Sequence, residues 1–160
     1  LHYPLRRQRQ MCIRDRVPVA AKRCVVKLDA KKEKSKLARW QGIAESAAKQ
    51  SKRRIVPEVM PVMSMQEALH FAKDMDVKLF PYELAEGMGK TKELIAGIRP
   101  GQSIAVFIGP EGGFEDGEVE AASECGFVPV TLGRRILRTE TAGFTVLAWI
   151  MYQLEADQGV

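Results

Sequence analysis

The chain has 160 residues, 46% of them hydrophobic, which is the size of an ordinary single domain with one core. No segment has the roughly 20 consecutive apolar residues of a membrane-spanning helix, and the N-terminus lacks the apolar part of a secretory signal, so we expect a cytoplasmic protein without a membrane partner. Three scattered cysteines without a Cys-x-x-Cys pair and two isolated histidines predict neither a disulfide framework nor a metal site.

Charge is distributed unevenly along the chain. Residues 1–54 hold 17 of the 25 Lys and Arg residues and four acidic residues, whereas residues 55–160 hold eight basic and 16 acidic residues. Such asymmetry suggests that one surface meets a polyanion and another does different work. A solvated basic tail beside a charged surface helix is the alternative interpretation.

The first 16 residues show neither helical nor strand periodicity and contribute +4 to the net charge. The run Met11 to Arg16 looks like a translated sequencing-adaptor scar, so we expect residues 1–16 to be a non-native or disordered tail on an N-terminally truncated reading frame. The alternative is a basic arm that docks on RNA phosphates. The domain is therefore expected over residues 17–160.

The next segment predicts a strand followed by a helix. Residues 23–28 form a strand candidate, and residues 29–36 are too polar to be buried. Apolar residues then recur at helical spacing beneath a basic face, and residues 51–54 end the helix. The apolar positions are Leu37, Trp40, Ala44, Ala47 and Ala48.

The middle of the chain alternates helices with extended segments. Residues 57–62 are expected to be extended, and Ser64 with Glu67 has the capping-box spacing that opens a helix to about Asp74. Residues 77–80 form a strand, and a glycine-containing loop leads to a short helix around residues 92–97.

The second half continues this alternation. Residues 103–108 form an apolar strand of the buried, parallel type, and acidic residues after Phe114 suit the first turn of a helix that runs to about Cys125. Residues 128–132 form another strand, and a long helix spans about 140–156. Strands that alternate with helices at this spacing predict an α/β fold with a mainly parallel sheet.

In such sheets ligands bind beyond the carboxyl ends of the strands, and three loops there are unusual. They span residues 81–83, 109–113 and 133–142. Glycines in the second loop allow a close approach to a flat ligand, but neither a Gly-x-Gly-x-x-Gly pattern nor a following Gly-Lys-Ser/Thr is present, so a phosphate cradle is not expected. A plain tight turn is the alternative for this loop.

The third loop places three arginines and an acid around an apolar pair. Arg134 and Arg135 also fit solvated surface charges. Arg138 stands next to the first turn of a helix, where a cation opposes the helix dipole unless a ligand or an acid offsets it. This position suggests that Arg138 has a ligand.

Three strings of this sequence resemble the RsmE methyltransferase family. They are Ile108-Gly-Pro-Glu-Gly-Gly-Phe114, Leu132-Gly-Arg-Arg-Ile-Leu-Arg-Thr-Glu-Thr-Ala142, and Arg23-Cys-Val-Val-Lys27 with Trp40 and residues 45–51. The resemblance covers roughly residues 21–154.

The resemblance implies a SPOUT domain, an α/β fold whose C-terminal segment forms a trefoil knot that binds S-adenosyl-L-methionine. Family members also carry an N-terminal PUA-like RNA-binding domain and a first strand and helix, which we expect to be absent from this truncated sequence. The implied cofactor-binding residues are Pro81, Tyr82, Glu83, Ile108, Gly109, Pro110, Glu111, Gly112, Gly113, Leu132, Gly133, Ile136, Leu137, Arg138 and Ala142.

The implied activity is methylation of N3 of a uridine in small-subunit (16S) ribosomal RNA by a homodimer. Uridine N3 must lose its proton, so Arg138 would stabilise the developing anion, and Glu140 or Glu111 would accept the proton or orient Arg138. Phosphate contacts are expected from Arg23, Lys27, Lys31, Lys32, Lys36 and Arg39. The alternatives are an inactive RNA-binding or dimerisation fragment, and a SPOUT methyltransferase that acts on transfer RNA.

Overall fold

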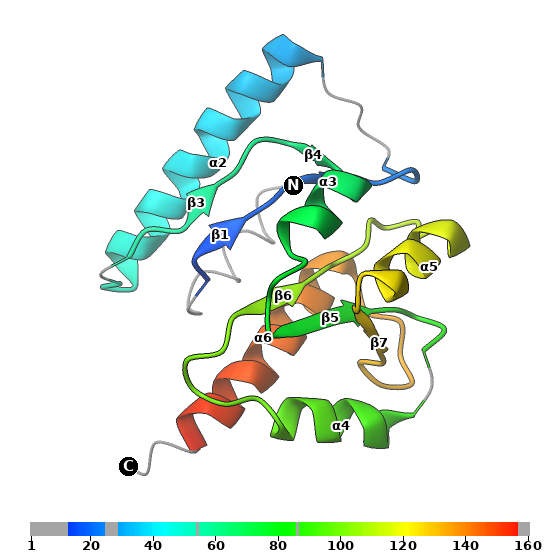
Figure 1. Ribbon diagram of the computed structural model, residues 1–160. Coiled ribbons are helices and arrows are strands. Elements are labelled where there is room, and N and C mark those ends of the chain that lie inside the picture. The colour runs from blue at the N-terminus through cyan, green and yellow to red at the C-terminus, as the bar shows by residue number, and fades with distance from the viewer. Residues whose placement is uncertain (1–12, 25–28, 54, 86, 157–160) are drawn as a thin grey trace.

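The computed structural model describes residues 13–24, 29–53, 55–85 and 87–156. At its centre is a three-stranded parallel sheet in the order β6–β5–β7 (Figure 1). The strands are β5 (Val77–Pro81), β6 (Ile104–Val106) and β7 (Val128–Val130). Leu79 of β5 pairs with Val106 on one side and Val128 on the other. The predicted α/β class with a parallel sheet is confirmed.

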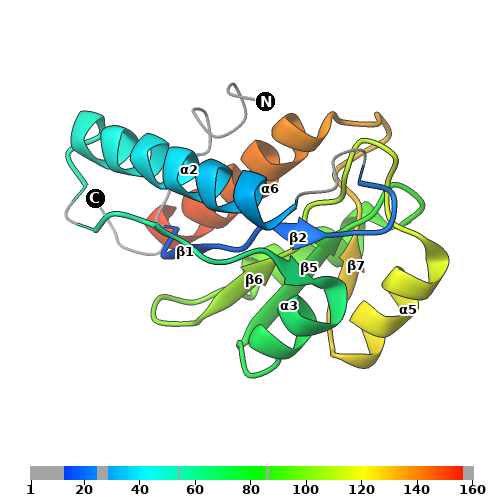
Figure 2. The ribbon, with the colours of Figure 1, turned by 90° about the horizontal axis from the view of Figure 1, so that it is seen from above.

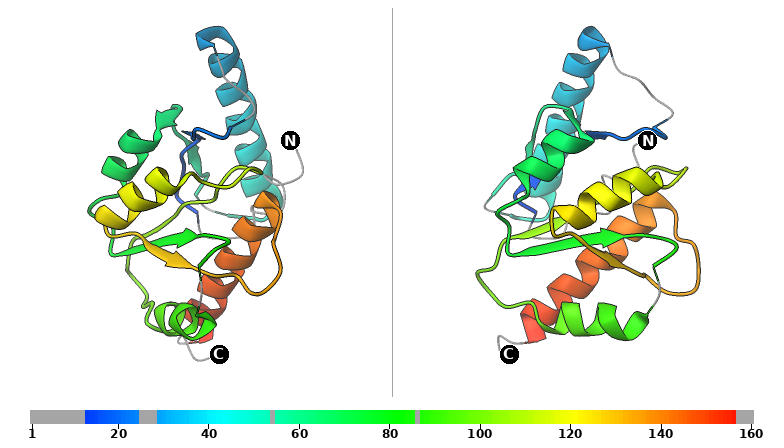
Figure 3. Two further views of the ribbon diagram at one scale, coloured as in Figure 1. Left: turned by 90° about the vertical axis from the view of Figure 1, so that its right-hand side faces the viewer. Right: turned by 45° about the vertical axis from the view of Figure 1, so that its right-hand side comes forward.

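Helices cover both faces of this sheet. Neighbouring residues of β5 point to opposite faces, and both faces carry apolar side chains that must be buried. Leu79 and Phe80 are both fully buried, each in a different core cluster. Figure 3 shows helices on the two sides of the strands. The helices are α3 (Met65–Phe71) and α5 (Asp116–Glu124) on the Phe80 side, and α4 (Met88–Ala96) and α6 (Thr139–Ala156) on the Leu79 side.

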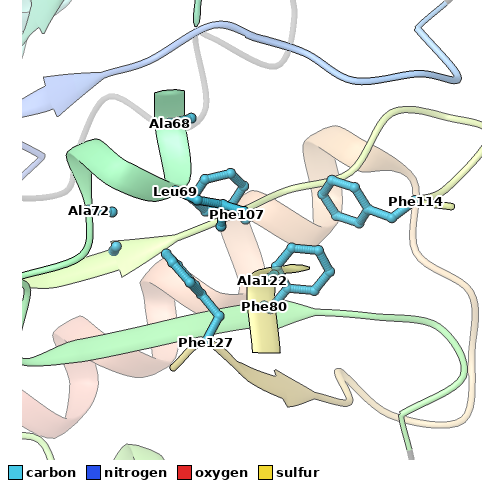
Figure 4. Packing of buried hydrophobic residues seen from close by; sticks show 9 residues of the cluster. Ala68, Leu69, Ala72, Phe80, Phe107, Phe114, Ala122 and Phe127 are labelled. Atoms are coloured by element: carbon cyan, nitrogen blue, oxygen red, sulfur yellow. The ribbon is translucent and has the colours of Figure 1, made fainter. Parts of the chain in front are cut away.

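The Phe80 face is built around four aromatic rings, which Figure 4 shows together. Phe80 lies 4.3 Å from Phe114 between ring centroids, and Phe107 lies 4.8 Å from Phe127 in an edge-to-face arrangement. Edge-to-face and offset geometries are the favourable ones for aromatic pairs. Phe114 directly follows the glycine-rich loop, so this cluster fixes one end of that loop.

The Leu79 face is aliphatic and holds α6 against the sheet. Ile98, Val130, Val146 and Ile150 complete its buried cluster with Leu79. Because Val146 and Ile150 are one helical turn apart, they present a continuous apolar stripe to the strands. This packing fixes the long axis of α6 and therefore the position of its N-terminus.

The N-terminal part forms two small parallel pairs, β1 (Asp15–Arg16) with β3 (Glu58–Val59) and β2 (Val19–Ala20) with β4 (Met63–Ser64). Helix α2 (Ala30–Gln50) connects them and lies along β1 and β3 (Figure 2). The Gln41 amide oxygen accepts from Val59 N at 2.8 Å. None of the helices in the described ranges combines the length and apolarity needed to cross a membrane.

Three sequence predictions need correction here. Helix α2 begins at Ala30, not near Leu37, because the Asp29 side chain caps it by accepting from Lys32 N at 2.8 Å. The strand expected from Arg23 is wrong at its start, since Arg23 lies in a turn, and residues 25–28 are outside the described residues. The prediction that residues 1–16 lie outside the fold is wrong for Asp15 and Arg16, which pair with β3.

The other elements follow the sequence. The capping box of Ser64 and Glu67 is present, with Ser64 N donating to Glu67 Oε2 at 2.8 Å. A second capping box, of Glu115 and Glu118, opens α5. The helices predicted around residues 92–97 and over about 140–156 are confirmed as α4 and α6, although α4 begins four residues earlier than expected.

Candidate active site

A cavity of about 580 Å³ lies beyond the carboxyl ends of the three central strands. All three strands are parallel, so the segments that leave them meet at one edge of the sheet. Pro81 ends β5, Ile108 follows β6 and Thr131 follows β7, and all three line the cavity. The volume is in the range of ordinary small-molecule sites, which is about 300–1,000 Å³.

The cavity brings together residues that are far apart in the sequence. The lining residues are Pro81, Tyr82, Glu83, Ile108, Gly109, Pro110, Glu111, Gly113, Phe114, Thr131, Leu132, Gly133, Arg134, Arg135, Ile136, Leu137, Arg138, Thr139, Glu140 and Ala142. Every candidate catalytic or cofactor-binding residue named from the sequence lines it, with the exception of Gly112. The Gly112 carbonyl instead accepts a hydrogen bond from the Arg23 guanidinium at 3.0 Å.

The loop after β6 needs glycine at two positions. A Cβ atom on Gly109 would lie 2.9 Å from the Phe114 ring. Gly113 has a φ of +70°, and a Cβ there would lie 2.9 Å from Glu83 Oε1. A larger residue at 109 would collide with the packed Phe114 ring, and one at 113 would be strained by its positive φ, although the exposed Glu83 side chain could move aside. The glycines therefore allow the main chain to approach the segment after β5 closely.

The segment after β7 is held by two threonine hydroxyls. Thr131 N donates to Thr91 Oγ1 of α4 at 3.2 Å, and Gly133 N donates to Thr131 Oγ1 at 3.3 Å. Gly133 has a φ of +114°, a conformation that glycine adopts without strain. These contacts fix the turn that carries Leu132 into the cavity.

The N-terminus of α6 closes another side of the cavity. Ala142 N donates to the Arg138 carbonyl at 2.8 Å. Arg138 therefore occupies the N-cap position, and its carbonyl accepts the first hydrogen bond of the helix. Glu140 follows in the first turn and is half-buried. The positive end of the helix dipole and Arg138 therefore belong to the same wall of the cavity, where an anionic or electron-rich group is favoured.

Charged groups of both signs face the cavity. Arg134, Arg135 and Arg138 come from one loop, and Glu83, Glu111 and Glu140 come from three different segments. Ile136 lies between the arginines and is 87% exposed. An exposed isoleucine among charges at the mouth of a cavity offers an apolar surface to a ligand.

Tyr82 brings a hydroxyl to the same cavity. Its oxygen lies 3.5 Å from Asp116 Oδ1, the long end of hydrogen-bonding distance. Burial raises the pKa of Tyr82, and the carboxylates of Asp116 and Glu83 raise it further. Tyr82 therefore stays neutral at physiological pH and keeps its proton as a hydrogen-bond donor.

The basic residues named for RNA contact lie elsewhere. Lys32, Lys36 and Arg39 are spaced by four and three residues, so they share one face of α2, on which Lys32 and Arg39 are exposed and Lys36 is half-buried. Lys31 is also exposed on α2, and Lys32 pairs with Asp29 at 3.0 Å. Arg23 contacts the glycine-rich loop, and Lys27 lies outside the described residues.

Sequence reasoning missed several residues of the site. Phe114, Thr131 and Thr139 line the cavity. Thr91 of α4, whose surface is 2% exposed, does not line it but supports the segment after β7. Phe114 and Thr139 were inside the quoted strings, but nothing in the sequence pattern indicated Thr91. In the described part of the chain, no three His, Cys, Asp or Glu side chains gather as metal ligands.

Comparison with known proteins assigns this chain to a family. A family model described as an RNA methyltransferase domain matches residues 5–151. The chain belongs to that family of RNA methyltransferase domains. The predicted resemblance to RsmE proteins is confirmed by curated relatives of that name.

Two curated relatives carry the name ribosomal RNA small subunit methyltransferase E. The protein of Bacillus subtilis (strain 168) is 42% identical over 146 residues, which are 89% of this chain and 57% of the relative. That of Mesomycoplasma hyopneumoniae (strain 232) is 38% identical over 130 residues, which are 81% of this chain and 54% of the relative. The RNA methyltransferase domain of this chain thus spans a little over half the length of these two relatives.

Solved structures of similar proteins share the fold. A ribosomal RNA small subunit methyltransferase E from Neisseria gonorrhoeae bound to S-adenosyl methionine superposes with a TM-score of 0.77 at 34% identity, over 96% of this chain and 60% of that one. A Legionella pneumophila protein in complex with the bound cofactor SAM gives a TM-score of 0.84 at 29% identity, over 95% of this chain and 61% of that one. Both share the arrangement of this methyltransferase domain.

Proposed function

We propose that this chain is the catalytic domain of an S-adenosyl-L-methionine-dependent methyltransferase that acts on N3 of a uridine in small-subunit (16S) ribosomal RNA. One observation carries the proposal: the two motif loops and the start of α6 line a single cavity of about 580 Å³ in a chain of this family. The two relatives crystallised with S-adenosyl methionine support the choice of cofactor.

The cofactor would be held by the three strand-end segments. Ile108, Leu132 and Leu137 offer apolar surface, and main-chain groups near Gly109 and Gly133 are open to a flat base. The cofactor supplies a methyl group on a positively charged sulfonium. The carboxylates of Glu83, Glu111 and Glu140 line the cavity and would attract this positive charge. The lining residues are therefore compatible with S-adenosylmethionine.

Arg138 is proposed as the catalytic cation. Uridine N3 is protonated at neutral pH, so its attack on a methyl group requires loss of that proton and creates negative charge on the ring. The Arg138 guanidinium, carried by the residue before α6, would stabilise this charge together with the helix dipole. Glu140 or Glu111 would take the proton or orient Arg138, since both line the same cavity.

The RNA partner is proposed to contact α2. Lys31, Lys32, Lys36 and Arg39 give this helix a basic face that suits phosphates, a contact that adds affinity without sequence preference. A homodimer, a trefoil knot in the C-terminal segment and a cytoplasmic location belong to the same proposal. They rest on the likeness to RsmE proteins.

Two rival functions make different predictions. An inactive RNA-binding or dimerisation fragment would keep the fold and bind no S-adenosylmethionine. A SPOUT methyltransferase specific for transfer RNA would bind the cofactor and leave ribosomal RNA unmodified. Cofactor binding therefore tests the first rival, and choice of RNA tests the second.

The deciding experiment has two stages. Isothermal titration of S-adenosylmethionine into the purified chain, with light scattering alongside, should give one cofactor per protomer of a dimer. Incubation with S-adenosylmethionine and unmodified 16S ribosomal RNA, followed by nucleoside mass spectrometry, should then yield N3-methyluridine, with bulk transfer RNA as the control substrate. A dimer that binds no cofactor would overturn the proposal, and modification of transfer RNA alone would favour the second rival.

A further inference from the structure

A short segment near the N-terminus, Ala21–Cys24, lies against the outer side of the glycine-rich loop. We name it the strap. Its residues do not line the cavity, yet each of the two central ones contacts the loop or the helix that follows it. The role of the strap in the proposed methyltransferase is not explained by cofactor or RNA contacts.

Glu118 of α5 is the anchor of the strap. It is 5% exposed and is one of two polar or charged residues in the buried set of the described chain. Its Oε1 accepts from Lys22 N at 3.0 Å, and its Oε2 accepts from Glu115 N at 3.0 Å. A buried carboxylate is costly unless it is hydrogen-bonded, and these two N–H groups with the N-terminus of α5 offset that cost.

Two further contacts run along the strap. Lys22 Nζ lies 3.1 Å from Glu115 Oε2. The Arg23 guanidinium donates to the Gly112 carbonyl at 3.0 Å, and a Cβ on Gly112 would lie 3.4 Å from the Arg23 Cβ. The strap therefore touches the loop at Gly112 and its exit at Glu115.

The inner side of the same loop faces the cavity. Gly109 and Gly113 line it, Gly113 N donates to the Pro110 carbonyl at 2.9 Å, and Phe114 is fixed in the aromatic cluster. A glycine-rich segment has high conformational freedom when it is not held. Contacts from outside the cavity add restraint to the loop without occupying the ligand's place.

We propose that Glu118 and Arg23 are positioning residues, which fix the glycine-rich loop from behind and so set the affinity of the cavity for S-adenosylmethionine. This inference rests on the proposed function. Preorganising a binding loop raises affinity because the ordering cost is met before the ligand arrives. Neither residue lines the cavity, so we expect their effect to be on loop order and not on the methyl-transfer step.

The test compares three variants of the full chain. Glu118→Gln keeps the shape of the side chain, but its amide N–H₂ cannot accept the second main-chain N–H. Arg23→Gln removes the guanidinium that donates to the Gly112 carbonyl. Glu120→Gln is the matched control, because Glu120 is an exposed acid on the same helix. Amide hydrogen exchange without cofactor, the dissociation constant for S-adenosylmethionine, and thermal unfolding are measured for each.

We expect Glu118→Gln and Arg23→Gln to speed exchange over residues 109–115 and to weaken cofactor binding about tenfold, the effect of losing roughly one hydrogen bond to a charged group. In turnover, KM for S-adenosylmethionine should rise while kcat changes little, and Glu120→Gln should match the wild type. If Glu118→Gln fails to fold, Arg23→Gln still decides the question.

Unchanged exchange in the loop, or an equal loss of protection over the whole sheet, would overturn the inference. A rise in loop exchange with wild-type cofactor affinity would also overturn it. The exchange measurement needs no ligand, so it separates this inference from the proposed function: a wild-type chain that binds no S-adenosylmethionine refutes the function, whereas the strap is judged by loop exchange.

Discussion

The hydroxyl of Thr91 accepts a hydrogen bond from the main-chain N–H of Thr131 at 3.2 Å, across 40 residues of sequence. Thr91 is buried in α4, on the aliphatic side of the sheet, and Thr131 lines the cavity. The Thr131 hydroxyl in turn accepts a hydrogen bond from Gly133 N, so the position of Gly133 also depends on this contact. Helix α4 thus holds a wall of the site that it does not itself form.

Replacing Thr91 with valine removes the hydrogen bond from Thr131 N and should lower the stability of the fold. The shape is kept, but the N–H of Thr131 loses its partner, so we expect the free energy of unfolding to fall by about 1–3 kcal/mol. Urea denaturation gives the value, and S-adenosylmethionine titration should show weaker binding. Thr91→Ser keeps the hydroxyl and should lose only about 1 kcal/mol, for the missing methyl group. A valine variant more stable than the serine variant would contradict this assignment.

Gly113→Ala should destabilise the protein by about 1–2 kcal/mol, because alanine is strained at the left-handed φ of +70° that this residue adopts. Gly42→Ala is the matched control, since Gly42 lies within α2 with open space around it and alanine there should stabilise by about 0.5–1 kcal/mol. Chemical denaturation of both variants measures the difference. Equal stabilities would show that the loop tolerates a side chain at residue 113.

Arg138→Ala should lower the methyl-transfer rate by about 10²–10³-fold, as removal of a group that stabilises developing charge does elsewhere. Affinity for S-adenosylmethionine should change little, because the charge develops on the RNA base. Single-turnover rates with saturating cofactor, measured beside Arg134→Ala from the same loop, test this. Loss of cofactor binding with a normal rate once the cofactor is bound would refute the catalytic role.

Acid should weaken the interaction between Asp76 and Ser103. Asp76 Oδ2 accepts from Ser103 N and from Ser103 Oγ, both at 2.7 Å, and these bonds lower the pKa of Asp76 below its usual 3.8. A carboxylate whose folded pKa is lowered stabilises the fold above its unfolded pKa, and this contribution is lost as the pH falls through the folded pKa.

Asp76→Asn should therefore lower Tm at pH 7, and the gap to the wild type should shrink below about pH 4, near the unfolded pKa of an aspartate. Thermal scans between pH 7 and pH 2.5 provide the measurement, with the exposed Asp74→Asn as the control. A gap that stays constant across this range would show that the charge of Asp76 is irrelevant to stability.

Neutralising Lys31 and Lys36 together should weaken RNA binding and make it less dependent on salt. The slope of log affinity against log salt concentration should decrease by about 0.7–0.9 for each phosphate that the protein no longer neutralises. Filter binding or fluorescence anisotropy at several salt concentrations gives the slope. Lys92→Gln on α4, at the opposite end of the molecule (Figure 1), should leave it unchanged. An unaltered slope in the double variant would remove α2 from the RNA surface.

The alternation of strands and helices and the segments of the site are predictable from the amino-acid order alone. Secondary-structure preference depends mainly on residues that are close in the sequence. Examples are the apolar run of residues 103–108 and the capping pair Ser64 and Glu67. Long motifs also depend on local order, so the strings around Gly109 and Arg138 identified the family before any contact was known.

The distant residues that support those strings, in contrast, are defined by the folded chain. Thr91, Glu118 and Arg23 act through hydrogen bonds to segments 40, 96 or 89 residues away, and no periodicity or spacing in the sequence encodes such a pairing. The pairing of Asp15–Arg16 with β3 was missed for the same reason, because a two-residue strand is stabilised by its partner and not by its own pattern. Parallel strands bring their ends together only when the sheet forms, and the cavity exists as a consequence of that assembly.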